Sequence, residues 1–345
     1  MNQPFVSGAL ETPAGQVPRV TSRLTFADRL GGCKARWGLG RMNYKVDPGL
    51  YALHSPGDSS PVLVTANYKL TLDALRRELG GLDAWILVVD TNGINVWCAA
   101  GKGTFGTEGV AAAIRDHGLE KVVSHRRVIL PQLGAPGAAA HELKRLSGFG
   151  AVFGPIAASH LPVFLARGLK ATPVMRKKQF PWRERAVLIP MELVAALKWG
   201  LMIAAALTIL GGLGPGSFSG SYLANALGHG LWAGAAVLWA ALAGSVGGPL
   251  LLPWLPGRAF ALKGLWLGLG AWLALTALAR PAPLEGLGWL GLMLALVSFL
   301  VMNFTGASTY TSLSGVKKEM RWAVPAQIGL GALGLIAWLA SPWLV

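Results

Sequence analysis

Cysteine is scarce in this sequence, since Cys33 and Cys98 are the only two among 345 residues. Two widely separated thiols make no disulfide framework, and they fit a reducing compartment. An iron–sulfur cluster normally needs four cysteine ligands, and a zinc site needs more Cys or clustered His. The sequence therefore predicts no internal iron–sulfur cluster and no zinc site.

Other chemistry-bearing motifs are missing as well. The run 101–104 lacks the spaced glycine that precedes the lysine of a Walker A phosphate loop. Six histidines leave a Cys–His hydrolase open by number alone, but the residues around Cys98 are not those of a recognisable cysteine-protease nucleophile. Residues 1–36 lack the apolar core of a cleavable signal peptide. A cofactor that needs one protein ligand is the natural use of Cys98.

Acidic residues are also few, since 16 of them stand against 31 Lys and Arg, for a net charge of +15. Residues 1–189 hold 24 basic and 13 acidic residues (+11), and residues 190–345 hold 7 and 3 (+4). A basic surface suits either nucleic acid or anionic lipid. Because the second half is almost uninterrupted Leu, Ala, Gly and Trp, we expect membrane lipid as a partner and no nucleic acid.

Long apolar runs occur only in this second half. Five of them, each about 20 residues long and able to cross a bilayer core, cover roughly 190–212, 222–245, 259–279, 284–304 and 323–343. The connections expected on the cytoplasmic side of the membrane hold Arg258, Lys263, Lys317, Lys318 and Arg321. The connections and the C-terminus expected on the opposite side hold only Arg280. By the positive-inside rule, this predicts a multi-pass protein of the inner (cytoplasmic) membrane, with the soluble domain cytoplasmic and the C-terminus outside.

A few polar residues lie in or beside these runs. Asn225 and His229 lie one helical turn apart in the second run. They form either a functional polar pair or, as we favour, a hydrogen bond between two helices. The hydroxyl-rich connection 303–312 either faces the soluble domain or is solvated. An alternative is a membrane transporter with a regulatory soluble domain. The spans hold few charges and show no obvious inverted repeat, which makes this alternative weaker but leaves it open.

Residues 61–175 alternate between strand and helix patterns. Strands are expected at 62–65, 84–89, 121–124, 128–130 and 151–153, and helices at 72–79, 108–117, 138–146 and 161–167. This alternation predicts an α/β, Rossmann-like domain. It is expected to follow an N-terminal segment, 1–60, that is loosely ordered over 1–35. A basic juxtamembrane linker, 176–189, then leads into an all-α membrane domain of five transmembrane helices, 190–345.

Seven residues of interest lie at or just after the ends of these predicted strands. They are Thr65, Asn67, Cys98, Gln132, Leu133, Gly134 and Gly154. Ligands of parallel α/β sheets bind at the carboxyl ends of the strands, so we expect these residues to converge on one pocket. Each glycine loop taken alone is equally well a plain turn. Cys33 is interpreted as a small structural residue, with a second metal-binding thiol as the less favoured alternative.

The stretch that carries Cys98 is Asn95-Val96-Trp97-Cys98-Ala99-Ala100-Gly101-Lys102, followed by Gly103-Thr104-Phe105. It lies between a predicted strand and a predicted helix, where backbone N–H groups and the helix dipole favour a thiolate. Lys102 adds a positive charge nearby. A thiolate in this position is a candidate nucleophile or soft metal ligand.

This octapeptide resembles the signature of the mercury-methylation corrinoid proteins, the HgcA family. The resemblance extends to 36–46, 65–70, 129–137 and the membrane tail. It implies that the octapeptide forms a short cap helix and that Cys98 binds the cobalt of a corrinoid, cobalamin or a relative, as lower axial ligand. The common His-ligated corrinoid motif is absent, because 116–118 does not match its spacing. The related corrinoid iron–sulfur protein carries cluster cysteines and lacks the cap cysteine, so this chain departs from it on both counts.

The resemblance also implies a reaction and its partners. Residues 95–105 and the strand-end residues are expected to contact the corrinoid, with Trp97 and Phe105 packed either under it or in the sheet core. Thiolate ligation pushes charge toward the methyl group of methyl-Co(III), which favours its transfer as a carbanion or radical to Hg(II), forming methylmercury under anaerobic conditions. The implied partners are an HgcB-like ferredoxin with two 4Fe–4S clusters and a methyl donor of the methyltetrahydrofolate pathway. A membrane corrinoid methyl carrier with another acceptor stays open, because Cys98 does not specify the acceptor.

Overall fold

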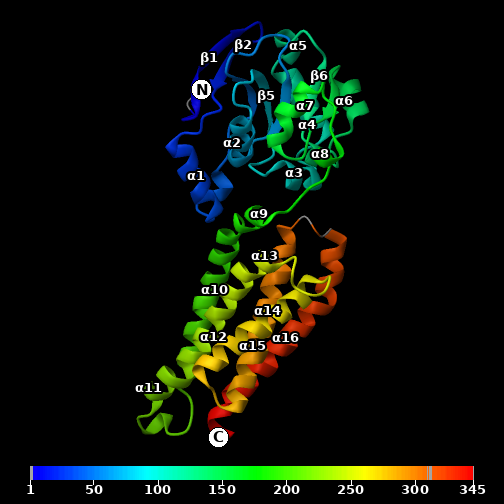
Figure 1. Cartoon of the computed structure of the whole chain (residues 1–345). Helices are drawn as coiled ribbons and strands as arrows, with labels where there is room; N and C mark the ends of the chain where they lie inside the picture. The colour runs from blue at the N-terminus through cyan, green and yellow to red at the C-terminus, as the bar shows by residue number, and fades with distance from the viewer. Residues whose placement is uncertain (1–2, 309, 311–312, 345) are drawn as a thin grey trace. The chain divides into compact units, whose positions relative to one another are not determined.

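The computed structural model describes residues 3–308, 310 and 313–344. The chain divides into two compact units: unit 1 comprises residues 1–35 and 39–179, and unit 2 comprises residues 36–38 and 180–345. Unit 1 is a mixed α/β sheet domain, and unit 2 is helical (Figure 1). The predicted change from an α/β domain to a helical domain is therefore present.

Unit 1 is built on one seven-stranded sheet in the order β1-β2-β3-β5-β4-β6-β7. The strands are β1 (Val6–Thr12), β2 (Gly15–Val20), β3 (Gly49–Leu53), β4 (Val62–Ala66), β5 (Ala84–Val89), β6 (Arg127–Leu130) and β7 (Gly150–Phe153). Strands β4 to β7 are parallel, β3 is antiparallel to β5, and β1 and β2 form an antiparallel hairpin. All residues of β3, β4 and β5 are buried, as expected for strands covered on both faces.

Helices cover both faces of this sheet. They are α1 (Phe26–Arg36), α2 (Lys69–Glu78), α3 (Val96–Lys102), α4 (Thr107–Asp116), α5 (Leu119–Val122), α6 (Ala140–Ser147), α7 (Leu161–Ala166) and α8 (Pro173–Arg176), with 3-10 turns η1 (Arg41–Asn43), η2 (Gln132–Gly134) and η3 (Ala158–His160). Leu63 of β4 packs in one buried cluster with Leu72 of α2, and its neighbour Val64 packs in the other with Val110 of α4 and Leu143 of α6. Successive strand residues point to opposite faces, which is why both clusters draw on the same strands.

Two predictions for unit 1 are wrong. The predicted loosely ordered segment 1–35 is ordered over residues 3–35, which form β1, β2 and most of α1, and β2 pairs with β3. Residues 1 and 2 lie outside the described residues. A short edge hairpin is held by backbone hydrogen bonds and needs little apolar periodicity, so the pattern missed it. Residues 121–124 are not a strand, because they hold the end of α5 and its C-cap, Val123. Val122 and Val123 are buried in the core from a helical turn, so tertiary packing overrides their β preference.

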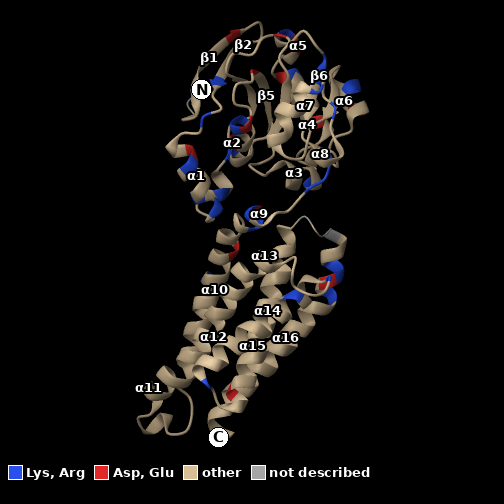
Figure 2. Ribbon diagram, viewed as in Figure 1, with Lys and Arg blue, Asp and Glu red and all other residues tan. Residues whose placement is uncertain are grey.

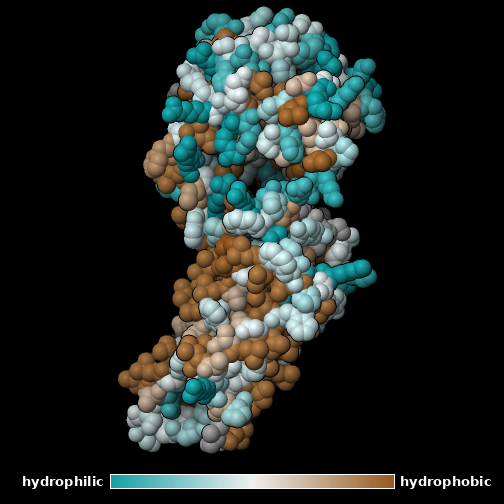
Figure 3. All heavy atoms as spheres, in the orientation of Figure 1, coloured by the Kyte–Doolittle hydropathy of each residue, from teal (hydrophilic) through white to brown (hydrophobic). Residues whose placement is uncertain are grey.

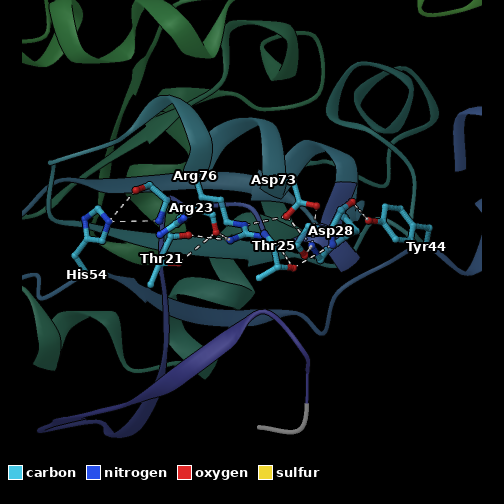
Figure 4. A network of polar contacts seen from close by, with 10 residues as sticks. Thr21, Arg23, Thr25, Asp28, Tyr44, His54, Asp73 and Arg76 are labelled. Atoms are coloured by element: carbon cyan, nitrogen blue, oxygen red, sulfur yellow. Dashed lines mark hydrogen bonds and ion pairs between the residues drawn. The ribbon is translucent and has the colours of Figure 1, made fainter. Parts of the chain in front are cut away.

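A buried ion-pair cluster, Asp28, Lys69, Asp73 and Arg76, ties α1 to α2 (Figure 4). The Lys69 ammonium donates to Asp28 at 2.7 Å and to both oxygens of Asp73 at 2.6 and 2.7 Å. The Arg76 guanidinium donates to Asp73 at 2.9 Å and to Asp28 at 2.7 Å. Two positive and two negative groups thus satisfy one another out of water, and they hold the N-terminal residues on the sheet domain.

The pH dependence of unit 1 should report on this cluster. Burial by itself would raise the pKa of Asp28, but hydrogen bonds from Lys69, from the Thr25 backbone and from Arg76 outweigh burial and hold that pKa well below its ordinary value of 3.8. A depressed folded-state pKa contributes stability above the unfolded-state pKa and loses it as pH falls through the folded-state pKa. We expect the urea midpoint of unit 1, followed by amide exchange of β5, to fall on acidification below pH 3.8. Asp28→Asn should flatten this part of the profile, and an unchanged acid slope would contradict the assignment.

Among its described residues, unit 2 contains five helices long and apolar enough to cross a membrane, as predicted. They are Trp182–Leu210, Tyr222–Leu251, Phe260–Ala279, Pro283–Gly306 and Ser314–Leu344. Their elements are α9 (Trp182–Ala186), α10 (Ile189–Leu210), η4 (Ser217–Ser219), α11 (Tyr222–Asn225), η5 (Ala226–Gly230), α12 (Leu231–Leu242), η6 (Ala243–Gly247), α13 (Gly248–Leu251), α14 (Phe260–Ala279), α15 (Pro283–Asn303), η7 (Phe304–Gly306) and α16 (Leu313–Leu344). Charged residues are sparse along these helices (Figure 2), and their outer surface is largely apolar (Figure 3). Such a surface suits a lipid environment.

Of the two polar residues singled out in the second span, His229 makes the contact that the sequence favoured, whereas the buried side-chain nitrogen of Asn225 has no hydrogen-bond partner within the described residues. His229 Nδ1 lies 2.9 Å from Glu285 Oε1 of α15, and the imidazole stacks on Trp338 of α16 with 4.7 Å between ring centroids. The helix–helix hydrogen bond is therefore present, with Glu285 as the partner of His229. In the hydroxyl-rich connection 303–312, residues 309, 311 and 312 lie outside the described residues.

Candidate functional site

The carboxyl ends of β4 and β5 are joined through the buried side chain of Asn67. Its Oδ1 accepts hydrogen bonds from the backbone N–H groups of Thr91 at 3.1 Å and Gly93 at 2.9 Å, and from the Thr91 hydroxyl at 2.9 Å. Its Nδ2 donates to Asp90 at 2.8 Å. The Asn67 amide, expected to contact a ligand, therefore holds the loop 90–93 that leads into α3.

The predicted cap helix is present as α3, and both of its ends are capped. Asn95 is the N-cap, and its side-chain oxygen accepts a hydrogen bond from the Cys98 backbone N–H at 2.9 Å. Gly103 is the C-cap, with φ 81°, and its N–H donates to the Ala100 carbonyl. The cysteine thus sits in the first turn of a short helix whose start is fixed by the residue three positions before it.

One face of α3 belongs to the core and the other is exposed. Val96, Ala99 and Ala100 are buried. Phe105, just after the helix, is also buried, so of its two predicted positions, under a corrinoid or in the sheet core, it occupies the core. Trp97, Cys98, Gly101, Lys102 and Gly103 are exposed. Residues three and four apart share a helix face, so Gly101 and Lys102 neighbour the thiol. A ligand can reach this exposed face of α3 without unpacking the core.

Two glycines let the segment after β6 pack closely under α3. A Cβ on Gly134 would lie 2.6 Å from the Phe105 ring, and a Cβ on Gly137 would lie 2.2 Å from the Phe105 carbonyl oxygen. Gly134, expected to contact a ligand, is thus required for packing. Gly137 was not singled out from the sequence, although it ends the run 129–137. Only the close approach of Phe105 reveals its role.

Beside the thiol, α3 leaves an open surface. A Cβ built on Gly101 would meet nothing within 4 Å. Gly101 lies three residues after Cys98, so the space above Gly101 is open on the helix face that also carries the thiol. A flat group can approach the thiol there, and any larger residue at 101 would occupy that space.

An apolar cavity of about 320 Å³ lies at the carboxyl ends of the parallel strands. Its walls include four predicted residues, Thr65, Val96, Leu133 and Gly154. The strand order places β4 between β5 and β6, so the chain crosses over beside β4, where ligands of parallel sheets bind. Gln132 does not line this cavity, and its side-chain oxygen accepts a hydrogen bond from Arg176 of α8. A more polar cavity of about 450 Å³ lies near the β1–β2 hairpin and holds none of the predicted residues.

The donor set at Cys98 is a single sulfur. Within residues 3–308, 310 and 313–344, no three His, Cys, Asp or Glu side chains gather in a way that could hold a metal ion. Cys33 is exposed on α1 and has no such cluster around it either. A metal bound through Cys98 would therefore have to bring its other ligands with it, as the metal of a macrocycle does.

The Asn95 cap should control the order of α3. Asn95→Ala removes the acceptor of the Cys98 N–H, and loss of an N-cap costs about 1 kcal/mol. We expect faster amide exchange over residues 96–102, while β5 is unaffected because its core contacts are unchanged. Asn95→Asp retains an acceptor and serves as the matched control. Equal protection of α3 in the alanine variant and the wild type would show that the cap is dispensable.

Comparison with known proteins places the similarity on this part of the chain. Residues 40–164 match the family model for the CO dehydrogenase/acetyl-CoA synthase delta subunit. The chain is 34% identical over 125 residues to the acetyl-CoA decarbonylase/synthase complex subunit gamma of Methanopyrus kandleri, covering 36% of this chain and 27% of that protein. It is 31% identical over 127 residues to the corrinoid/iron–sulfur protein large subunit of Moorella thermoacetica, covering 36% and 28%.

The matched region spans about a quarter of the length of these curated relatives. It contains the strand ends, the apolar cavity and α3, and it excludes the five apolar helices. The chain is therefore similar in sequence to the CO dehydrogenase/acetyl-CoA synthase delta subunit over residues 40–164. Over 36% of its length it is similar to an acetyl-CoA decarbonylase/synthase complex subunit gamma and to a corrinoid/iron–sulfur protein large subunit.

Proposed function

We propose that unit 1 binds a corrinoid on the exposed face of α3, with Cys98 as the lower axial ligand of cobalt, and that the protein transfers a methyl group to Hg(II). The observation that carries this proposal is the capped helix that sets a single exposed thiol beside the open surface at Gly101. Similarity to a corrinoid/iron–sulfur protein supports the cofactor. The octapeptide 95–102 supports mercury as the acceptor through its resemblance to the HgcA family.

The residues of this site fit such a group. A bound corrinoid supplies methyl transfer at cobalt, and its ring nitrogens fill the equatorial positions, so one protein donor is enough. Cys98 provides that donor as a thiolate, and Asn95 holds its backbone N–H. Gly101 leaves room for a flat macrocycle. The cavity lined by Thr65, Leu133 and Gly154 is apolar and suits the planar base of the cofactor tail.

Fold, membrane placement and partners complete the proposal. The parallel strands β5-β4-β6-β7, with helices on both faces, are interpreted as a Rossmann-like corrinoid-binding domain. Unit 1 is placed in the cytoplasm by the positive-inside rule. A ferredoxin with two 4Fe–4S clusters returns electrons to the cofactor, and a methyltetrahydrofolate-dependent donor supplies the methyl group.

The direct test is methylmercury formation from Hg(II) by the purified full chain loaded with methylcobalamin under strict anaerobiosis. A single turnover needs no electron donor, so the loaded protein alone should give product. Methylmercury above the level formed by free methylcobalamin is the expected result. Bound corrinoid that keeps its methyl group in the presence of Hg(II) would contradict mercury as the acceptor.

A second candidate is a membrane corrinoid methyl carrier with another acceptor. It is favoured by the acetyl-CoA decarbonylase/synthase relatives, whose names place them in a complex with a different product. The same preparation separates the two candidates. Methyl loss to an added thiol, without methylmercury from Hg(II), would support the carrier and leave corrinoid binding intact.

The open surface at Gly101 gives a steric test of the binding face. We expect Gly101→Leu to weaken corrinoid binding by about tenfold or more, since a clash of about 1.4 kcal/mol is already tenfold. Unit 1 should stay folded, because removing a helical glycine favours the helix by roughly 0.5–1 kcal/mol and no atom beyond the adjacent residues and the helix's own backbone lies within 4 Å of the new Cβ. The measurement is a titration with aquacobalamin followed by visible absorbance.

The matched control for this variant is Gly109→Leu. Gly109 is an exposed helical glycine of α4, and a Cβ there would make only ordinary contact with Val89 at 3.8 Å. Unchanged affinity in the Gly109 variant and lost affinity in the Gly101 variant is the expected pair of results. Equal affinity in both variants would place the corrinoid elsewhere on unit 1.

A further inference from the structure

Helix α1 turns an apolar face away from the domain it belongs to. Phe26 is 79% exposed and Leu30 is 43% exposed, and Cys33 is exposed as well. Spaced by four and three residues, these positions lie on one side of the helix. Figure 3 shows apolar surface over the position of α1. A large aromatic and a leucine held in water on one helix stripe indicate a surface that is normally covered.

The opposite face of α1 is locked onto unit 1. Its buried residues are Asp28, Gly32 and Ala35, which also share one side of the helix. Asp28 receives hydrogen bonds from Lys69 and Arg76, both at 2.7 Å. The helix therefore cannot rotate to bury Phe26 and Leu30 without breaking the buried ion-pair cluster, so the exposed apolar side of α1 is a fixed feature of the surface.

The apolar surface continues beyond the helix. Leu39 is 65% exposed and Met42, in η1, is 76% exposed. The segment 26–42 thus exposes five large apolar side chains, of which Trp37 is grouped with unit 2 and the other four belong to unit 1. We call Phe26, Leu30, Leu39 and Met42 the apolar stripe.

The chain segment that carries this stripe is rich in positive charge, and its one acidic residue is buried. Residues 23–45 contain six basic residues, Arg23, Arg29, Lys34, Arg36, Arg41 and Lys45, and one acidic residue, Asp28. Arg29 and Lys34 are exposed, whereas Asp28 is buried and neutralised by Lys69 and Arg76. An apolar stripe edged by Lys and Arg matches a leaflet that offers acyl chains beneath anionic headgroups.

We propose that the apolar stripe is a membrane-interface anchor, in which Phe26, Leu30, Leu39 and Met42 enter the headgroup region of an anionic leaflet while Arg29 and Lys34 contact lipid phosphates. The short connection between unit 1 and the first apolar span keeps a lipid surface within reach of unit 1. Unit 1 ends at Gln179 and the first apolar span begins at Trp182, a connection that extends about 10 Å at most. So short a tether gives lipid a high effective concentration at unit 1, which favours lipid over a soluble partner.

This anchor is independent of the corrinoid proposal. The apolar stripe shares no residue with α3 or with the apolar cavity. Its effect is to give unit 1 a preferred orientation toward the lipid surface. Failure of methyl transfer would leave it standing, and its failure would leave the Cys98 site unchanged.

Cys33 provides a native reporter for the test. In the full chain with Cys98→Ser it is the one remaining thiol, and it lies on the exposed side of α1. A nitroxide attached there, in vesicles of phosphatidylcholine and phosphatidylglycerol, is compared for collision with oxygen, which enriches in lipid, and with a water-soluble nickel complex. The matched control carries Cys33→Ser, Cys98→Ser and Glu120→Cys, because Glu120 is exposed on α5, a separate helix of unit 1.

We expect the oxygen-to-nickel ratio at position 33 to be several-fold higher than at position 120. Adding Arg29→Glu and Lys34→Glu should lower the ratio at 33 toward the value at 120, with the fold intact because both side chains are exposed. Equal ratios at the two positions in the anionic vesicles would overturn the anchor. Low collision rates with both reagents at position 33 would also overturn it, because they would show that protein covers the stripe.

Discussion

Replacing Cys98 by alanine should abolish methyl transfer to Hg(II) while unit 1 remains folded. The Cys98 side chain is exposed, so its removal opens no cavity in the core, and alanine is the better helix former. Under the proposed function, Cys98 is the one protein donor to cobalt. Loss of a residue that hydrogen-bonds to a metal ligand already lowers activity about 10–100-fold, so we expect loss of the ligand itself to lower it about 100-fold or more.

Two measurements on the loaded full chain check this expectation. The rate of methylmercury formation reports the reaction, and the visible spectrum of the bound corrinoid reports whether sulfur is its axial ligand. Cys33→Ala is the matched control, because Cys33 is the other exposed thiol and lies on α1, outside the site. Wild-type rates in the Cys98 variant, with corrinoid bound, would show that the thiolate is dispensable.

Arg76→Leu should be the most destabilising single substitution among the charged residues of unit 1. Arg76 is 1% exposed and donates to both Asp28 and Asp73. Removing one partner leaves two buried carboxylates with Lys69 alone, and breaking a buried ion pair in this way costs about 3–5 kcal/mol. The variant also loses the hydrogen bonds that Arg76 donates to the carbonyls of Thr21 and Arg23.

Arg77→Leu is the matched control for this loss. Arg77 is the next residue of α2, but its side chain is 60% exposed and pairs with Glu78 on the surface. Surface ion pairs contribute about 0–1 kcal/mol, so we expect little change. Urea dependence of amide exchange in β5, measured on the full chain, gives both values. Similar midpoints for the two variants would mean that the cluster contributes no more than a surface pair.

The Arg76 variant also bears on the membrane anchor. Asp28 is the buried contact that keeps the apolar stripe facing outward, and it would lose one of its two cationic partners. We expect faster amide exchange over α1 than over α2 in this variant, since α1 is held at the periphery by fewer buried residues.

Local patterns in the sequence were sufficient for some features of this protein. Strand and helix periodicity placed β4 to β7, except that residues 121–124 were assigned to a strand, because adjacent valines favour strands locally. Five runs of bilayer length are a property of composition alone, and the five apolar helices follow them closely. The cap helix at 96–102 was reached through the resemblance of its octapeptide.

Which side chains are available at the site depends on tertiary packing, which local sequence patterns do not contain. Asn67, Gly134 and Phe105 follow strand ends or flank Cys98 as a ligand-binding residue would, yet their atoms are used for hydrogen bonding and packing within the chain. Position after a strand is a local property, but the direction of a side chain depends on neighbours far along the sequence, as Asp90 and Thr91 are for Asn67. The same reason explains the buried ion-pair cluster, because Asp28 meets Lys69 and Arg76 across 41 and 48 residues of chain.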